Sequence, residues 1–190
     1  MGLGTLGLAA RPIVSGRWFH GRRSQEADLV IYGAGAGGLC AAVQAARMGA
    51  EVVVIEPTTW IGGMLTAAGV SALDGNKHGA GGGLVQTFRQ RLADHYGSLD
   101  ALFTGWVSLY CYEPHVRHRI LQEWVAPPNP LVARGLRLVQ DGEIIERRIT
   151  VERAGGETGD VVADGFIGAT EDGGGPPPAR LPFPLRRASQ

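Results

Sequence analysis

Three glycines and one glutamate have the spacing of a site for a phosphate-bearing ligand. They are Gly33, Gly35, Gly38 and Glu56, and the glycines lie in the run Gly33-Ala34-Gly35-Ala36-Gly37-Gly38. In a strand-to-helix turn, the first glycine allows the tight bend, the second lets a pyrophosphate approach the backbone, and the third lets the helix pack on the strand. The N–H groups of the first helical turn then face the phosphates. Glu56 stands 18 residues beyond Gly38, where its carboxylate can accept hydrogen bonds from both ribose hydroxyls and would repel a 2′-phosphate, which disfavours NADP.

The neighbouring residues supply the elements that would position this chemistry. The apolar run Leu29 to Ile31 predicts a buried parallel strand. An alanine-rich pattern from Leu39 to Met48 predicts a helix with Leu39 and Met48 packed inward, and Gly49 is expected to end it as a left-handed cap. Val52 to Ile55 then reads as a second strand that ends at Glu56. Together these segments predict a dinucleotide-binding βαβ unit.

The glycine spacing alone is weak evidence. With 30 Gly in 190 residues, about 0.7 such motifs are expected by chance. Gly2, Gly4 and Gly7 fit the same pattern, but no strand precedes them and Arg11-Pro12 interrupts any helix that follows. The flanking strands, the helix and the acid therefore carry the prediction. The alternative for Glu56 is a charged residue that ends a strand at the surface.

Three further segments give the sequence a family resemblance. They are Val54-Ile55-Glu56-Pro57 with Trp60-Ile61-Gly62-Gly63-Met64, then Tyr112-Glu113-Pro114-His115-Val116, and then Phe166-Ile167-Gly168-Ala169-Thr170-Glu171. In this order they resemble the FAD-dependent oxidoreductases with two dinucleotide-binding domains, over residues 28 to about 171. The resemblance implies FAD as cofactor, with Gly62, Gly63 and Met64 along the flavin's pyrophosphate. Gly168 replaces an aspartate that is usual in the family, and the alternative for Gly62-Gly63 is an ordinary turn.

The resemblance also implies a position for the glycine-rich segment 66–83. Such a segment runs toward the flavin ring, which makes Asn76, Lys77 and His78 the polar groups expected to meet flavin or substrate. A surface loop is the alternative. His115 and His118 lie one turn apart on an expected helix, but without a third ligand we interpret them as polar helix residues and predict no metal site.

The rest of the chain predicts helices and short strands. Helical spacing favours helices at Leu84 to Tyr96 and Pro114 to Trp124, and Leu131 to Ala133 is a short strand candidate. A β-meander is expected from strands at 136–139, 144–151 and 161–163, with a return to the parallel sheet through Phe166-Ile167. That return should bring Ala169-Thr170 near the phosphates. The fold class is thus α/β, a Rossmann-like FAD/NAD(P)-binding domain with a meander insertion, incomplete at its C-terminus.

The composition of the sequence gives expectations about the ends of the chain, its partners and its location. Residues 1–26 are expected to be a flexible extension, 27–171 the FAD-binding domain, and 172–190 a disordered Gly/Pro-rich tail, with a truncated or frameshifted product favoured over a genuine short protein. A formal net charge of zero argues against nucleic acid or an acidic membrane surface as partner, and no apolar run is long enough to span a membrane. Cys40 and Cys111 are expected to be buried thiols of a reducing compartment, so we expect a cytoplasmic protein; export is the alternative if the true start lies upstream.

Three functions follow from these patterns. The first is an FAD-dependent oxidoreductase, or its N-terminal FAD-binding portion, that uses hydride transfer through flavin; no catalytic residue is assigned. The second is a non-catalytic module that binds adenine nucleotides. The third is an NAD-binding dehydrogenase domain, in which Gly62-Gly63 would have no role.

Overall fold

The described part of the chain folds around one mixed sheet. The computed structural model describes residues 24–73, 82–104, 110–126, 130–139, 144 and 147–171. The strands are β1 (Ser24–Tyr32), β2 (Val52–Glu56), β3 (Leu131–Arg134), β4 (Leu136–Leu138), β5 (Arg148–Arg153) and β6 (Thr158–Gly168). Their order across the sheet is β3-β2-β1-β6-β5-β4, with β3, β2, β1 and β6 parallel and β5 and β4 antiparallel. The predicted α/β class, with a parallel sheet and a meander, is confirmed.

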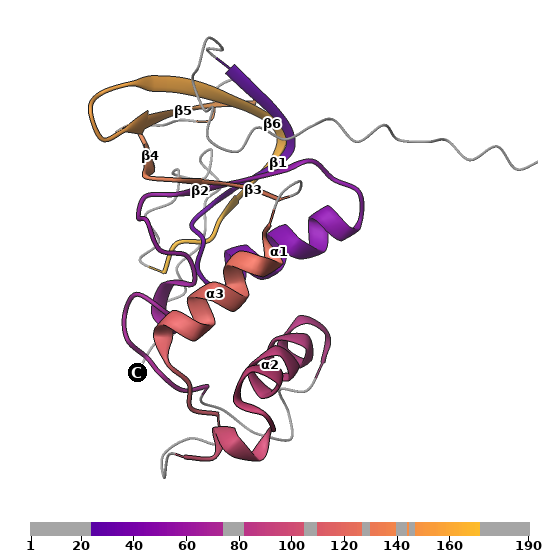
Figure 1. The fold of residues 1–190 in the computed structure, drawn as a ribbon. Helices are drawn as coiled ribbons and strands as arrows, with labels where there is room; N and C mark the ends of the chain where they lie inside the picture. Colours follow the sequence, from indigo (N-terminus) through magenta and orange to yellow (C-terminus); the bar gives the residue numbers. More distant parts are fainter. Residues whose placement is uncertain are drawn as a thin grey trace, which may run out of the picture.

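Three helices lie on one side of this sheet (Figure 1). They are α1 (Ala36–Arg47), α2 (Gly83–Tyr96) and α3 (Pro114–Trp124), and two short 3-10 turns, η1 (Gly63–Leu65) and η2 (Asp100–Leu102), lie between them in the chain. In Figure 1, α1 and α3 lie next to the sheet, and α2 lies beyond α3. The predicted helices at 84–96 and 114–124 are therefore confirmed.

The two faces of the sheet bury two separate apolar clusters. Ile31, Val52 and Val54 face the helices and pack with α1 and α3. Val30 and Val53, which alternate with them along the strands, belong to the second cluster, which they share with residues of β4, β5 and β6. Because side chains of a strand alternate between faces, both faces need apolar residues where the strands are buried, at Leu29–Tyr32 of β1 and Val52–Ile55 of β2, as their continuous runs predicted. The meander of β4, β5 and β6 thus covers the face of the sheet that the helices leave uncovered.

Helix α1 ends one residue earlier than its apolar pattern predicted. Gly49 adopts a φ of 95°, which confirms the left-handed cap. Leu39 is buried as expected, but Met48 is 78% exposed. The expectation for Met48 was wrong because α1 ends at Arg47 and Met48 is its C-cap, outside the buried stripe of the helix.

Two other expectations need correction. The separate strands predicted at 161–163 and 166–167 form one continuous strand, β6, because the long β1 offers it parallel partners from Ser24 to Tyr32. Cys40 and Cys111 are half-buried rather than fully buried. Burial raises the pKa of the Cys40 thiol, which keeps it in the unreactive protonated form. Asp141-Gly142, a dipeptide that favours a hairpin turn between the first two strands of the predicted meander, lies outside the described residues.

Candidate functional site

Two glycines of the loop between β1 and α1 are required by the fold itself. Gly33 has a φ of 102°, and a Cβ there would lie 2.7 Å from the carbonyl carbon and oxygen of Ala169. A Cβ at Gly38 would overlap the carbonyl oxygen of Gly33 and lie 3.1 Å from the Cβ of Ala169. The Ala169 N–H also donates to the Tyr32 carbonyl at 2.7 Å. Ala169-Thr170 thus reaches the glycine loop, where the resemblance expected it, and Gly33 and Gly38 permit that approach.

Gly35 and Gly37 are different, because the described residues give no reason for a glycine at either position. Gly35 has φ −67° and ψ −179°, an extended backbone that any residue adopts. The nearest atom to a Cβ at Gly35 would be 3.4 Å away, an ordinary contact, and no described atom lies within 4 Å of one at Gly37. A pyrophosphate that approaches the backbone at Gly35 explains the missing side chain.

The N-terminus of α1 is also left open to an anion. Within this fully described helix, Gly35 provides no side-chain cap and the first turn holds no acidic residue. Its first N–H groups have no intrahelical acceptor, and the helix dipole favours negative charge there. The loop therefore fits a phosphate group on its backbone geometry and on its electrostatics.

Glu56 is buried and anchors the glycine loop to β2. It is 8% exposed, so the alternative that it merely ends a strand at the surface is wrong. Its Oε2 accepts the Ala34 N–H at 2.8 Å, and its Oε1 accepts the Thr58 N–H at 2.9 Å and the Thr58 hydroxyl at 2.8 Å. A carboxylate offers about four lone-pair positions. Three are used within the chain, so two ribose hydroxyls can bind only if the Thr58 hydroxyl turns away.

The turn at Gly62 and Gly63 lies directly against the glycine loop. The Gly62 N–H donates to the Ala34 carbonyl at 2.7 Å, and Gly35 and Gly62 form an isolated parallel bridge. Gly62 has a φ of 108° and Gly63 a φ of 53°, and a Cβ at Gly62 would lie 2.6 Å from a Thr66 methyl group. The pair is thus a tight turn that brings Met64 beside the loop, and its place next to Gly35 suits a ligand that spans both segments.

Helix α3 supports this turn from the side of the helices. The His118 Nδ1 lies 3.2 Å from the Ile61 carbonyl oxygen, and its ring stacks on Trp60 with centroids 4.5 Å apart. Arg117 donates to the Leu65 carbonyl through a long contact of 3.4 Å. One helix therefore contacts the backbone on both sides of the glycine pair.

Arg117 is a buried cation inside this support. Its side chain is 0% exposed, and its guanidinium carbon lies 4.7 Å from the Phe88 ring centroid and 4.1 Å from that of Tyr112. Its Nε has no hydrogen-bond partner in the described part of the chain. Burial lowers the pKa of Arg117 to about 9, because the charged form loses its hydration. The two rings partly replace that hydration through cation–π contact.

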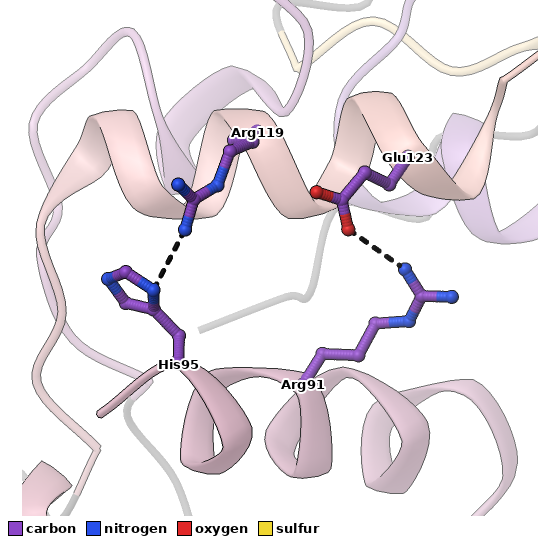
Figure 2. Close-up of polar contacts among 4 residues, drawn as sticks. All are labelled: Arg91, His95, Arg119 and Glu123. Carbon is purple, nitrogen blue, oxygen red and sulfur yellow. Dashed lines mark hydrogen bonds and ion pairs between the residues drawn. The ribbon is translucent and has the colours of Figure 1, made fainter. Parts of the chain in front are cut away.

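Helix α2 holds α3 from its outer side through two polar contacts (Figure 2). Arg91 of α2 pairs with Glu123 of α3 at 3.3 Å. His95 Nδ1 lies 2.8 Å from an Arg119 guanidinium nitrogen, so His95 is the acceptor. These contacts join α2 to the helix that supports the glycine pair.

Glu171 lies in the same place and was not among the expected site residues. Its Oε1 accepts the Met64 N–H at 2.7 Å, and the same oxygen would be 3.4 Å from a Cβ at Gly35. A polar residue just after a parallel strand is a signal that could have singled it out, since ligands of open α/β sheets bind at the carboxyl ends of strands. The support given by Thr58, Arg117 and His118 has no comparable signal in the sequence.

The other residues singled out from the sequence add no contact to this site among the residues that the structure describes. Asn76, Lys77 and His78 lie outside them. His115 is exposed, and across the described ranges no three His, Cys, Asp or Glu side chains gather as metal ligands. None of the helices described is long and apolar enough to cross a membrane.

The family model for FAD dependent oxidoreductases matches residues 28–184. The chain belongs to this family. The match continues past Glu171, whereas the resemblance found in the sequence covered residues 28 to about 171 only. A comparison of this FAD-dependent oxidoreductase family member with curated proteins found no match in sequence.

Solved structures share the fold of this family member at low sequence identity. AlpK matches with a TM-score of 0.53 and 20% identity, over 75% of this chain and 31% of AlpK. OxyS anhydrotetracycline hydroxylase from Streptomyces rimosus matches with 0.51 and 15%, over 76% of this chain and 32% of that one. Thermovibrio ammonificans THI4 also gives 0.51 and 15%, over 76% and 56%. The family member therefore spans from just under a third to just over half of the length of these proteins.

Proposed function

We propose that this chain binds FAD as the cofactor-binding part of an FAD-dependent oxidoreductase. The pyrophosphate would lie over the backbone of Gly35 at the N-terminus of α1. Glu56 would take the adenosine ribose, and Gly62, Gly63 and Met64 would lie along the flavin side of the phosphates. The family match to an FAD-dependent group supports the choice of cofactor.

The observation that carries this proposal is the open space and unstrained backbone at Gly35. Its backbone angles are open to any residue, and the nearest atom to a Cβ there would be 3.4 Å away. The fold therefore leaves Gly35 without a structural reason to be glycine, whereas Gly33 and Gly38 have one. Close approach of a ligand to the backbone supplies the missing reason.

Bound flavin supplies the hydride transfer in such enzymes, and the protein supplies position and electrostatics. In this chain, Glu56 fixes the glycine loop through the Ala34 N–H, and Ala34 in turn accepts the Gly62 N–H. The ribose site and the turn on the flavin side are thus joined through one residue. We infer that these contacts set the angle at which a bound dinucleotide crosses the loop.

We extend the proposal to the organisation of the chain. The cofactor-binding unit would comprise residues 27–171 together with residues 24–26, which form the start of β1 and pair with β6. The formal net charge of zero supports a protein that binds neither nucleic acid nor an acidic membrane surface. A cytoplasmic location is the accompanying proposal.

A non-catalytic module for adenine nucleotides is the second candidate, and one observation favours it. The Glu171 carboxylate lies against Gly63, where its Cδ would be 2.7 Å from a Cβ. The carboxylate is thus closest to the glycine pair, on the side expected for flavin, while Glu56 keeps one lone-pair position for an adenosine ribose hydroxyl. Such a module would bind ADP as tightly as FAD.

Titration of the purified 190-residue chain tests these readings. FAD, ADP and NAD are each titrated by calorimetry, and the flavin fluorescence of the FAD sample is recorded. We expect FAD to bind most tightly, with its fluorescence changed on binding, and ADP to compete with it. Equal affinities for ADP and FAD with unchanged flavin fluorescence would favour the nucleotide module. Stronger binding of NAD, or no binding of FAD, would contradict the proposal.

A further inference from the structure

Glu171 places a negative charge inside the proposed pyrophosphate site. Its Oε1 accepts the Met64 N–H at 2.7 Å. A Cβ at Gly35 would lie 3.4 Å from this oxygen, and a Cβ at Gly63 would overlap it. The carboxylate therefore lies between the glycine loop and the glycine pair, the two segments that the ligand is expected to span.

A phosphate and this carboxylate cannot share the place. A backbone N–H offers one hydrogen, and that of Met64 already has its acceptor. None of the ion pairs between described residues includes Glu171. The basic side chains of these pairs therefore do not neutralise the Glu171 carboxylate when a second anion approaches. Like charges this close repel, and the repulsion weakens binding.

The chain also allows Glu171 to leave. The residue is exposed, and it follows β6, which ends at Gly168. Backbone contacts hold the chain up to Ala169, whose N–H donates to Tyr32. A rotation of the Glu171 side chain into water breaks the contact with Met64 and leaves the sheet intact.

We propose that Glu171 is an internal anion of the dinucleotide site, bound to the Met64 N–H between Gly35 and Gly63 and displaced by the diphosphate of the ligand. Glu171 thereby determines how tightly the site holds diphosphates. This inference rests on the proposed function, because it needs a diphosphate that binds over Gly35.

Two substitutions separate charge from hydrogen bonding at this position. Glu171→Gln keeps an oxygen that accepts the Met64 N–H but removes the charge, and Glu171→Ala removes both. If the carboxylate competes with the ligand, both variants bind FAD and ADP more tightly, by about tenfold, which corresponds to ~1.4 kcal/mol. Glu157→Gln is the matched control, since Glu157 is an exposed acid in the turn before β6, and its affinity should equal that of the parent chain.

The same variants test the opposite role. If Glu171 instead positions the glycine pair for the ligand, Glu171→Ala weakens FAD binding while Glu171→Gln leaves it unchanged. That result, or unchanged affinity in both variants, overturns the inference but leaves FAD binding itself established. If neither the parent chain nor any variant binds FAD or ADP, the proposed function fails and this inference fails with it.

The amide signal of Met64 reports directly on its contact with Glu171. In the ¹H–¹⁵N spectrum of the full chain, Glu171→Ala should move the Met64 amide signal and speed its hydrogen exchange. Addition of ADP to the parent chain should move the same signal, because the phosphate replaces the carboxylate. A Met64 amide that responds to neither change overturns the inference.

Discussion

The N-termini of α1 and α2 are alike in local structure but differ in what surrounds them. Each begins after a glycine with extended backbone, Gly35 at φ −67° and Gly82 at φ −115°, and neither fully described helix has a side-chain cap or an acid in its first turn. At Gly35, however, the Gly62 turn forms a bridge, and Ala169 and Glu171 lie within 4 Å of a Cβ placed there. No described atom lies that close at Gly82.

This comparison shows that an open helix N-terminus is not a site by itself. Both helices begin with N–H groups that have no intrahelical acceptor, and both have a favourable dipole at this end. Only α1 lies at the carboxyl end of a parallel strand, where the ends of β1, β2 and β6 bring separate segments together. We attribute the proposed binding to this convergence.

Matched substitutions at the two glycines test the comparison and should have the largest effect. Gly35→Ala should weaken FAD binding by at least about thirtyfold, ~2 kcal/mol, because the methyl group fills the space through which the pyrophosphate approaches. Gly82→Ala should change the affinity by less than about twofold. Calorimetric titration with FAD measures both, and circular dichroism checks that each variant folds. Equal losses at both glycines would show that the two helix ends do not differ.

The free energy of unfolding tests whether Glu56 anchors the glycine loop that precedes α1. Glu56→Ala leaves the Ala34 N–H and the Thr58 N–H without their acceptor, while the Thr58 hydroxyl keeps the Trp60 carbonyl at 2.7 Å. The free energy of unfolding should fall by about 2 kcal/mol, since an unpaired buried donor costs about 1–3 kcal/mol. Glu51→Ala, at an exposed acid just before β2, is the control and should change it by less than about 0.5 kcal/mol. Urea denaturation gives both values, and similar losses would contradict the role of Glu56 in anchoring the loop.

Arg117 gives a smaller, pH-dependent effect on the support of the turn. Folding lowers the pKa of Arg117 from its ordinary value to about 9. Above pH 9 the unfolded chain therefore binds more protons than the folded chain, and stability rises with pH. Arg117→Met removes this contribution. The free energy of unfolding of the parent chain, relative to Arg117→Met, should be lowest below pH 9 and increase at pH 10.5. Denaturation at pH 7 and pH 10.5 measures it, and a difference that stays constant or shrinks would contradict a cation destabilised by burial.

The Arg91–Glu123 pair between α2 and α3 should have the smallest effect. Its side chains are 40% and 56% exposed, and exposed ion pairs contribute about 0–1 kcal/mol. A double-mutant cycle with Arg91→Ala and Glu123→Ala should give a coupling energy below about 1 kcal/mol that decreases in 0.5 M salt. A larger, salt-independent coupling energy would contradict this expectation, because it would show that the pair between α2 and α3 strongly stabilises the helix that supports the glycine pair.

The sequence predicted best what depends on local pattern. The apolar run at Leu29 to Ile31, the helix cap at Gly49 and the helix from Pro114 to Trp124 were all found, because periodicity and glycine position encode them. Met48 was placed wrongly, since the exact end of a helix depends on cap geometry that an apolar pattern does not contain.

The site was predictable in part for the same reason. Gly33, Gly35 and Gly38 follow one another in a motif, so their positions could be read from the sequence. That Glu56 binds the Ala34 N–H, or that Glu171 reaches Met64, depends on contacts between residues 22 and 107 positions apart. Such contacts are set by how the strands assemble, which no local pattern specifies.

The most direct test of the account is the ¹H–¹⁵N spectrum of the full chain during titration with FAD. We predict that the amide signals of Gly35, Gly37, Gly38 and Met64 shift as FAD binds, while that of Gly82 stays in place. Equal shifts at Gly35 and Gly82, or no shift at Gly35 under conditions where FAD binds, would contradict the claim that the loop after β1 holds the pyrophosphate.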